Sequence, residues 1–73
     1  MADVKFGAIL QNPSIPEVTV MFLRRGEWSG RFQSFEAVLL TDREYPRNYT
    51  LMRAKIGSVQ TCWTVESWTL LHD

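Results

Sequence analysis

The sequence has few residues of the kinds that carry out chemistry. It contains one cysteine, one histidine and four glycines among 73 residues. A single cysteine cannot form an internal disulfide, whereas a small secreted domain usually carries several. One cysteine and one histidine also fall short of a metal-ligand cluster, and the glycines form no phosphate-binding loop. We therefore expect no metal, no cofactor and no nucleotide site, and a reducing, cytoplasmic setting.

The residues that most often act as nucleophile or base are poorly placed. His72 is the next to last residue, where chains tend to fray, and nothing in the sequence would hold it beside a serine or cysteine. Cys62 is predicted opposite an arginine, which could lower the thiol pKa, although an inert, half-buried thiol is the commoner situation. The carboxyls of Asp42 and Glu44 have no evident partner. The sequence therefore predicts a protein that is not an enzyme.

Long apolar runs and a net charge are also lacking. No stretch approaches the roughly 20 apolar residues of a membrane helix, and residues 1–10 have neither the basic start nor the apolar run of a signal peptide. The formal net charge is zero, so the chain lacks the general basic field of a nucleic-acid-binding protein. The charges are unevenly spread, however, because residues 24–55 carry seven basic and four acidic side chains.

Apolar residues, by contrast, are plentiful. They make up 45% of the chain and include three tryptophans, which is enough for one compact core and too many for a disordered chain. We expect a single domain over residues 1–73.

The best-defined local pattern is a β-hairpin from Tyr49 to Leu71. Its predicted type II′ turn is Gly57-Ser58, because Gly takes the required conformation at little cost. If Ile56 faces Val59, alternation of side chains places most of the apolar residues of both strands on one side and leaves the other side mostly polar. That predicted core-facing side consists of Thr50, Met52, Ala54, Ile56, Val59, Thr61, Trp63 and Val65.

The first half of the chain predicts further strands. Val4 to Leu10 suits an edge strand weakened by Gly7, and the two prolines that follow predict a loop. Val18 to Arg25 is apolar on both faces, as in a central strand covered on both sides. Gly26 is expected to form a turn, after which Trp28 to Phe32 returns as a short strand.

The segment that follows favours a short helix. Ser34 is a suitable N-cap and Glu36 lies in the first turn, where the helix dipole favours an acid. Ala37 and Leu39 would equally suit one face of a strand. The sequence therefore predicts an α+β fold, a small antiparallel sheet of four to five strands with one short helix over its apolar face. The alternative is an all-β small barrel in which residues 31–42 form a strand.

Arginines alternate with aromatic residues in two predicted loops. Trp, Tyr and Arg dominate binding hot spots, because the rings supply large contact areas and Arg makes paired bonds to carboxylates. We expect a partner-binding site where both loops meet at one end of the sheet. The predicted partner-binding residues are Arg24, Arg25, Trp28 and Arg31 in the first loop and Arg43, Tyr45 and Arg47 in the second.

In length, in its strands, in a short helix of the Ser34-Phe35-Glu36-Ala37 type and in its lack of catalytic motifs, the chain resembles small phage-encoded proteins that redirect host machinery. Among these it resembles Xanthomonas phage regulators of bacterial RNA polymerase. The resemblance implies a non-enzymatic inhibitor, monomeric when free and located in the cytoplasm of the bacterial host. Such a protein would dock on the large polymerase subunits and disturb σ-factor engagement during transcription initiation.

Two other classes of function stay open. One is a nucleic-acid-binding β-module that uses the basic centre, although zero net charge argues against direct contact with a long phosphate track. The other is an anti-defence protein that binds a host protein or a small molecule.

Overall fold

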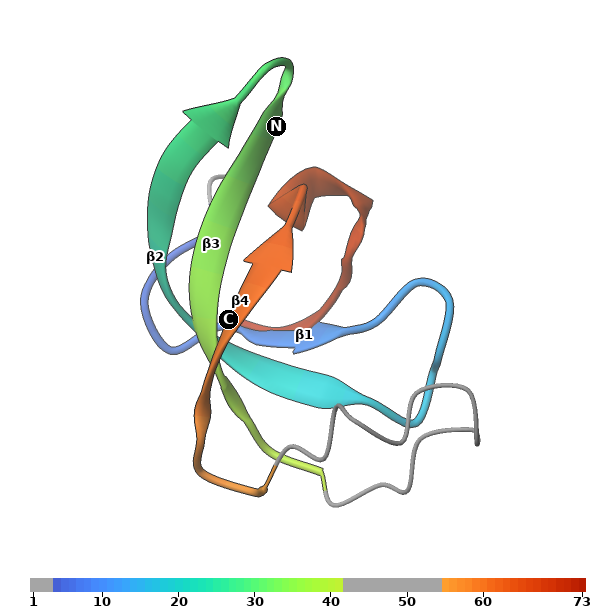
Figure 1. The fold of residues 1–73 in the computed structure, drawn as a ribbon. Helices are drawn as coiled ribbons and strands as arrows, with labels where there is room; N and C mark the ends of the chain where they lie inside the picture. The colour runs from blue at the N-terminus through green and yellow to red at the C-terminus, as the bar shows by residue number, and fades with distance from the viewer. Residues whose placement is uncertain (1–3, 42–54) are drawn as a thin grey trace, which may run out of the picture.

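The chain folds into one antiparallel sheet with almost no helix. A computed structural model describes residues 4–41 and 55–73. The strand order across the sheet is β4-β3-β2-β1-β5, as Figure 1 shows. The strands are β1 (Ile9–Gln11), β2 (Thr19–Ser29), β3 (Phe32–Leu39), β4 (Val59–Trp63) and β5 (Thr69–His72), and a 3-10 helix, η2 (Val65–Ser67), separates β4 from β5.

The predicted helix after Ser34 is a strand. Phe35, Ala37 and Leu39 are buried, whereas the residues between them are only half-buried, so burial follows the period of two that marks a strand. Pairing with β2 along the length of β3 outweighs the weak capping signal. The α+β prediction is therefore wrong, and the all-β alternative fits better. Within the described residues the sheet is open, since its end strands β4 and β5 do not pair with each other.

β2 is the central element of this sheet. It confirms the central strand predicted over Val18 to Arg25, but it continues through Gly26 as far as Ser29. Its register with β3 shifts twice, between Phe22 and Arg24 and between Arg25 and Trp28. Such irregularities bend a strand, and Figure 1 shows the first part of β2 beside β1 and the second part rising with β3.

The turn predicted at Gly26 is therefore wrong, as is the return strand from Trp28 to Phe32. The chain reverses later, at Gly30 and Arg31, where Gly30 has a φ of 61°. A positive φ of this kind suits Gly. The two strands therefore extend past the bulges and form a protruding β2–β3 hairpin.

The curved sheet encloses a single core. Phe35, Leu10 and Val20 are its largest fully buried side chains. The Phe35 ring lies 5.8 Å from the Phe22 ring and 5.5 Å from the Trp68 ring, which it meets edge-on, a favourable arrangement of aromatic rings. η2 contributes the buried Val65 to the same core.

β4 faces the opposite way from the prediction. It pairs with β3, with Cys62 opposite the buried Phe35 and Trp63 opposite Ser34. Opposite residues share a face, so Cys62 points inward while Val59 and Trp63 point outward and are 56% and 48% exposed. The predicted core side is thus the outer side of β4, and its predicted partner, residues 49–54, lies outside the described residues.

The strand also ends earlier than predicted. Thr64 has a φ of 56°, which interrupts the alternation and turns Val65 into the core. The predicted glycine turn is confirmed in part, because Gly57 has a φ of 87°. The Ser58 amide donates to the Lys55 carbonyl, which makes Gly57 the third residue of the turn, as in type II rather than type II′.

Of the two predictions for the N-terminal part of the chain, an edge strand and a following loop, only the loop is confirmed. Gly7 lies in a turn with a φ of 92°, so β1 begins at Ile9. β1 lies between β2 and β5, which makes the predicted edge position wrong. The predicted loop before β2 is confirmed, and Asn12 Oδ1 accepts hydrogen bonds from the backbone amides of Ser14 and Ile15, as in an Asx turn.

Candidate functional site

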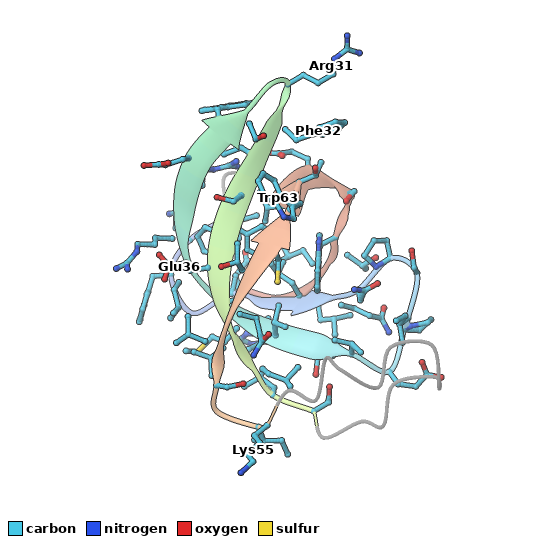
Figure 2. The ribbon with its side chains drawn as sticks, in the orientation of Figure 1. Arg31, Phe32, Glu36, Lys55 and Trp63 are labelled. Atoms are coloured by element: carbon cyan, nitrogen blue, oxygen red, sulfur yellow. The ribbon has the colours of Figure 1, made fainter. Side chains whose placement is uncertain are left out.

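The predicted partner-binding residues of the first loop do not share a surface. Arg24 pairs with Glu36 on the outer face, whereas Arg25 is opposite the core residue Phe35. Trp28 is 66% exposed, but it is opposite Gln33, which alternation places on the same face as Phe35. Only Arg31 lies at the tip of the hairpin (Figure 2). Those of the second loop, Arg43, Tyr45 and Arg47, lie outside the described residues.

The charge of Arg24 is locally balanced. Its Nε donates to Glu36 Oε1 over 2.8 Å, and 72% of the Arg24 side chain is exposed. Exposed pairs of this kind typically contribute only about 0–1 kcal/mol. Arg24 therefore adds little net positive charge to the outer face.

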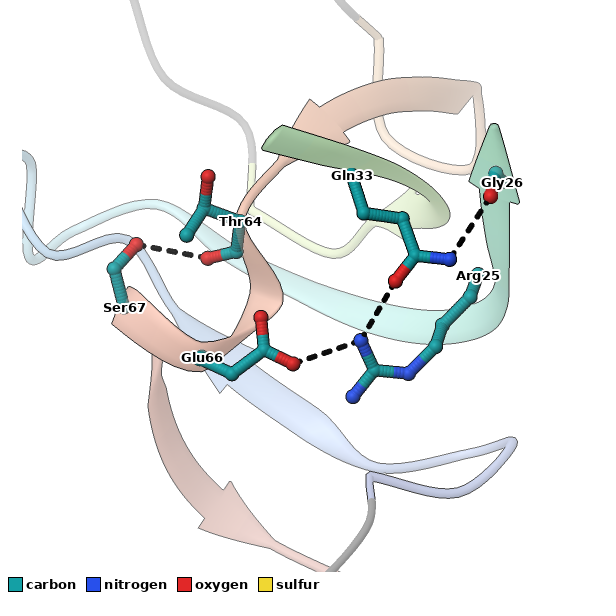
Figure 3. Close-up of polar contacts among 6 residues, drawn as sticks. All are labelled: Arg25, Gly26, Gln33, Thr64, Glu66 and Ser67. Atoms are coloured by element: carbon teal, nitrogen blue, oxygen red, sulfur yellow. Dashed lines mark hydrogen bonds and ion pairs between the residues drawn. The ribbon is translucent and has the colours of Figure 1, made fainter. Parts of the chain in front are cut away.

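Arg25 has a structural role. Its Nη1 donates to Glu66 Oε2 over 2.8 Å and to Gln33 Oε1 over 3.1 Å, and Gln33 Nε2 donates in turn to the Gly26 carbonyl, as Figure 3 shows. The hydrogen bond from Arg25, followed by one from a backbone amide, lowers the pKa of Glu66. This network joins β2, β3 and η2.

Four side chains at this end of the sheet line a hollow. Ser29, Phe32, Trp63 and Thr64 line a shallow depression of about 390 Å³, which we name the aromatic hollow. Phe32 and Trp63 are 54% and 48% exposed. Figure 2 shows Arg31 at the hairpin tip, Phe32 next to it on the hairpin, and Trp63 at the end of β4.

Strand register brings the two rings together. Trp63 lies opposite Ser34, and Ser34 shares its face of β3 with Phe32, two residues earlier. Such diagonal neighbours across adjacent strands are within reach of aromatic side chains. Ser29 lies opposite Phe32, which places its hydroxyl on the same side of the hairpin.

Two hydrogen bonds to the backbone of Thr64 hold the Trp63–Thr64 side of the hollow. The Thr64 amide donates to the Gln33 carbonyl over 2.9 Å, and Ser67 Oγ donates to the Thr64 carbonyl over 2.8 Å. Thr64 is the only non-glycine residue with a positive φ among residues 4–41 and 55–73. For a β-branched residue this conformation is strained, and such strain is often found at functional sites.

The structure describes the environment of the one thiol and of the potential metal ligands in residues 4–41 and 55–73. Burial raises the pKa of the Cys62 thiol to about 11, which disfavours the reactive thiolate. No cluster of three or more His, Cys, Asp or Glu side chains suitable for a metal occurs in residues 4–41 and 55–73. The same part of the chain has no helix of the length and apolarity needed to cross a membrane.

Comparisons of the chain with protein-family models, with curated proteins and with solved structures gave no match. The candidate site is therefore defined by its geometry. Sequence reasoning missed Trp63, which it placed in the core, and it noted an aromatic-rich turn without including Phe32 in the site. A strand over residues 32–39 would have put Phe32 on the outer face, opposite the buried set.

Proposed function

We propose that this chain is a non-enzymatic, protein-binding regulator that contacts its partner through the aromatic hollow and Arg31. One observation carries the proposal: Phe32 and Trp63 lie together in a shallow depression while each remains about half exposed. Exposed apolar patches often mark interaction surfaces, and tryptophan and arginine are enriched among the residues that dominate binding energy. The core has other aromatic residues, Phe22, Phe35 and Trp68, so the fold does not need these two rings.

The partner we propose is bacterial RNA polymerase, as the resemblance of the sequence suggests. In this proposal the chain docks on the large subunits and changes σ-factor engagement and promoter use. Arg31 supports an acidic or mixed protein surface as the target, because a guanidinium makes paired, charge-assisted bonds to a carboxylate. Its side chain forms no ion pair with residues 4–41 or 55–73.

A second candidate function is a module for single-stranded nucleic acid. The exposed rings of Phe32 and Trp63 favour it, because successive bases stack on aromatic side chains beside basic groups. The distribution of charge supports it less well. Arg24 and Arg25 are already paired, and Figure 2 shows Lys55 at the opposite end of the sheet from Arg31. Within the described residues, Arg31 is therefore the one basic side chain at the hollow that has no acidic partner.

Binding to purified polymerase tests the proposal. We expect the chain to bind the core enzyme, and Trp63→Ala and Phe32→Ala each to weaken binding about 30-fold, which corresponds to a lost anchor of roughly 2 kcal/mol. Val59→Ala is the matched control, since Val59 is an exposed apolar residue on the same strand and face as Trp63. It should bind like the original chain, and thermal unfolding should show all three variants folded.

Salt dependence separates the two candidates. Contact with six or more phosphates would weaken binding about a thousandfold or more between 50 and 200 mM salt, whereas a protein interface is far less sensitive. Tight, salt-sensitive binding to a 30-nucleotide single strand, without binding to polymerase, would replace the proposed function with the second candidate. Equal polymerase binding by all three variants would remove the aromatic hollow from the proposal.

A further inference from the structure

The aromatic hollow is a shallow depression, open to solvent and large enough to receive a side chain from another molecule. Its volume of about 390 Å³ lies near the lower end of the range of about 300–1,000 Å³ for ligand pockets. It is open to solvent, so an occupant enters from the surface rather than through a channel. A side chain presented from the surface of another molecule can enter such an open depression directly.

The lining indicates what kind of side chain would bind. Phe32 and Trp63 offer aromatic surface, and rings prefer edge-on or offset contact with another ring. Ser29 and Thr64 add hydroxyls at the margin, and neither side chain hydrogen-bonds to residues 4–41 or 55–73. Such hydroxyls are suited to the backbone amides and carbonyls of an incoming chain. An aromatic side chain on a peptide backbone satisfies both features.

The charge beside the hollow indicates what should flank that side chain. Arg31 directly precedes Phe32 and lies at the exposed hairpin tip. Glu36 and Glu66 are already engaged by Arg24 and Arg25, and Glu27, the remaining acid of the hairpin, forms no ion pair with Arg31. A carboxylate that flanks the incoming ring would therefore meet a cation at the tip of the hairpin that carries Phe32.

We infer that the aromatic hollow receives one aromatic side chain from an acidic peptide segment, and that a carboxylate within two residues of that ring pairs with Arg31. The inference rests on the proposed function and specifies which segment of the partner is recognised. A single available cation favours a short acidic segment over a phosphate backbone, which requires a row of basic groups.

A second copy of this chain is another conceivable occupant. The same hairpin carries Glu27 followed by Trp28, an acidic and aromatic pair in which Trp28 is 66% exposed. A stable protein interface usually buries about 800 Å² on each partner, which is a large area for contact between two hairpin tips. We therefore favour a separate partner, and self-association is one outcome of the test.

Synthetic peptides test the inference without polymerase. The probes are three fluorescein-labelled octapeptides with the central sequences Asp-Phe-Asp, Asn-Phe-Asn and Asp-Ala-Asp, and a labelled oligo(dT) of eight nucleotides. Fluorescence anisotropy at 50 and 150 mM salt measures binding. We expect Asp-Phe-Asp to bind at least tenfold more tightly than the other three probes.

Variants of the chain assign each contact. Arg31→Gln should remove the preference for Asp over Asn but retain the preference for Phe over Ala, and Trp63→Ala should do the reverse. Thr61→Ala is the control, because Thr61 lies on the outer face of β4 with Trp63 but does not line the hollow. Glu27→Gln changes the charge of the same hairpin by the same magnitude and should not alter the Asp over Asn preference.

Several results would overturn the inference. The inference fails if the three peptides bind equally or if the oligonucleotide binds more tightly than the peptides. It also fails if Glu27→Gln changes the preference for Asp over Asn as much as Arg31→Gln does, because the preference would then reflect net charge alone. Concentration-dependent dimerisation that Trp28→Ala abolishes would assign the hollow to a second copy. The two proposals fail separately: if polymerase binding depends on Trp63 but the peptides do not bind, only this inference falls. If the peptides bind as expected but polymerase does not, only the polymerase assignment falls.

Discussion

Arg25 Nη1 lies 2.8 Å from Glu66 Oε2, so an ion pair joins the bend of β2 to the 3-10 helix η2. Glu66 follows Val65, which is buried in the core, and Thr64, which lines the aromatic hollow. A shift of η2 would therefore move one side of the hollow and part of the core together. The bulges of β2 place Arg25 where it reaches Glu66 and Gln33 at once.

The Arg25–Glu66 pair predicts a dependence of stability on pH. The hydrogen bond from Arg25 lowers the pKa of Glu66 in the folded chain. The ionised Glu66 carboxylate therefore stabilises the folded state fully above its unfolded pKa of about 4.3. This stabilisation is lost as the pH falls through the lowered pKa that Glu66 has in the folded chain. Urea unfolding should show Glu66→Gln destabilised at pH 7 and the difference from the original chain reduced at pH 2–3. Glu27→Gln is the control, and an equal pH effect in both variants would contradict the prediction.

The two neighbouring tryptophans should differ in their effects on stability. Trp68 packs edge-on against the buried Phe35, so Trp68→Ala should lower the free energy of unfolding by about 3 kcal/mol. Trp63 is 48% exposed, and Trp63→Ala should cost less than about 1 kcal/mol, as surface substitutions usually do. Urea unfolding of both variants measures this. A larger loss of unfolding free energy for Trp63→Ala would mean that Trp63 is buried in the core.

Trp63 was predicted in the core but is exposed, and this error shows which feature of the fold the sequence does not determine. The turn at Gly57 was predictable from one residue, because few residues accept a positive φ. Which face of β4 is buried depends instead on its neighbour, and the alternation of apolar residues was interpreted for a pairing with residues 49–56. With β3 as the neighbour, Cys62 lies opposite Phe35 and the two faces exchange roles. The positive φ of Thr64 has no sequence signal, since threonine rarely adopts it.

The same reasoning explains what could be predicted about the site. A turn region rich in arginine and aromatic residues was visible in the sequence. Its assembly was not, because the two rings of the hollow come from Phe32 and Trp63, which are far apart in the chain. Only the register of β3 with β4 makes them neighbours. Segment 32–39 also fits two periodicities locally, and pairing with β2 decides between them.

A side chain at Gly26 should destabilise the fold. A Cβ at this position would meet Ser34 Oγ, so Gly26→Ala should destabilise by about 1–3 kcal/mol, as overpacking does. Ser34→Ala removes that oxygen and should recover part of the loss in the double variant. The single Ser34→Ala variant is needed as well, because Ser34 Oγ also donates to the Glu27 carbonyl. Additive effects of the two substitutions would contradict a direct contact.

Gly57 tests backbone strain without crowding. A Cβ built there has no atom within 4 Å among the described neighbours, so only the φ of 87° should oppose a side chain. We expect Gly57→Ala to cost about 1 kcal/mol and Gly57→Asn to cost less, because Asn tolerates this region better. Chemical denaturation of both variants gives the comparison. Equal stability of the Ala variant and the original chain would exclude strain at this turn.

Cys62 should react slowly while the chain is folded. Burial raises its pKa from 9.0 to about 11, so at pH 7.5 the folded chain holds a thiolate fraction about 100-fold lower than the same thiol in the unfolded state. The rate of alkylation by iodoacetamide, followed by mass spectrometry, should therefore rise about tenfold or more in denaturing urea, since the greater nucleophilicity of a high-pKa thiolate offsets part of the loss of thiolate. In the folded chain the rate should keep rising up to about pH 11. Glutathione in both solvents corrects for the effect of urea on the reagent. Alkylation of the folded chain at the rate of free glutathione would place Cys62 at the surface, and the inward face of β4 would then be the one that carries Val59 and Trp63.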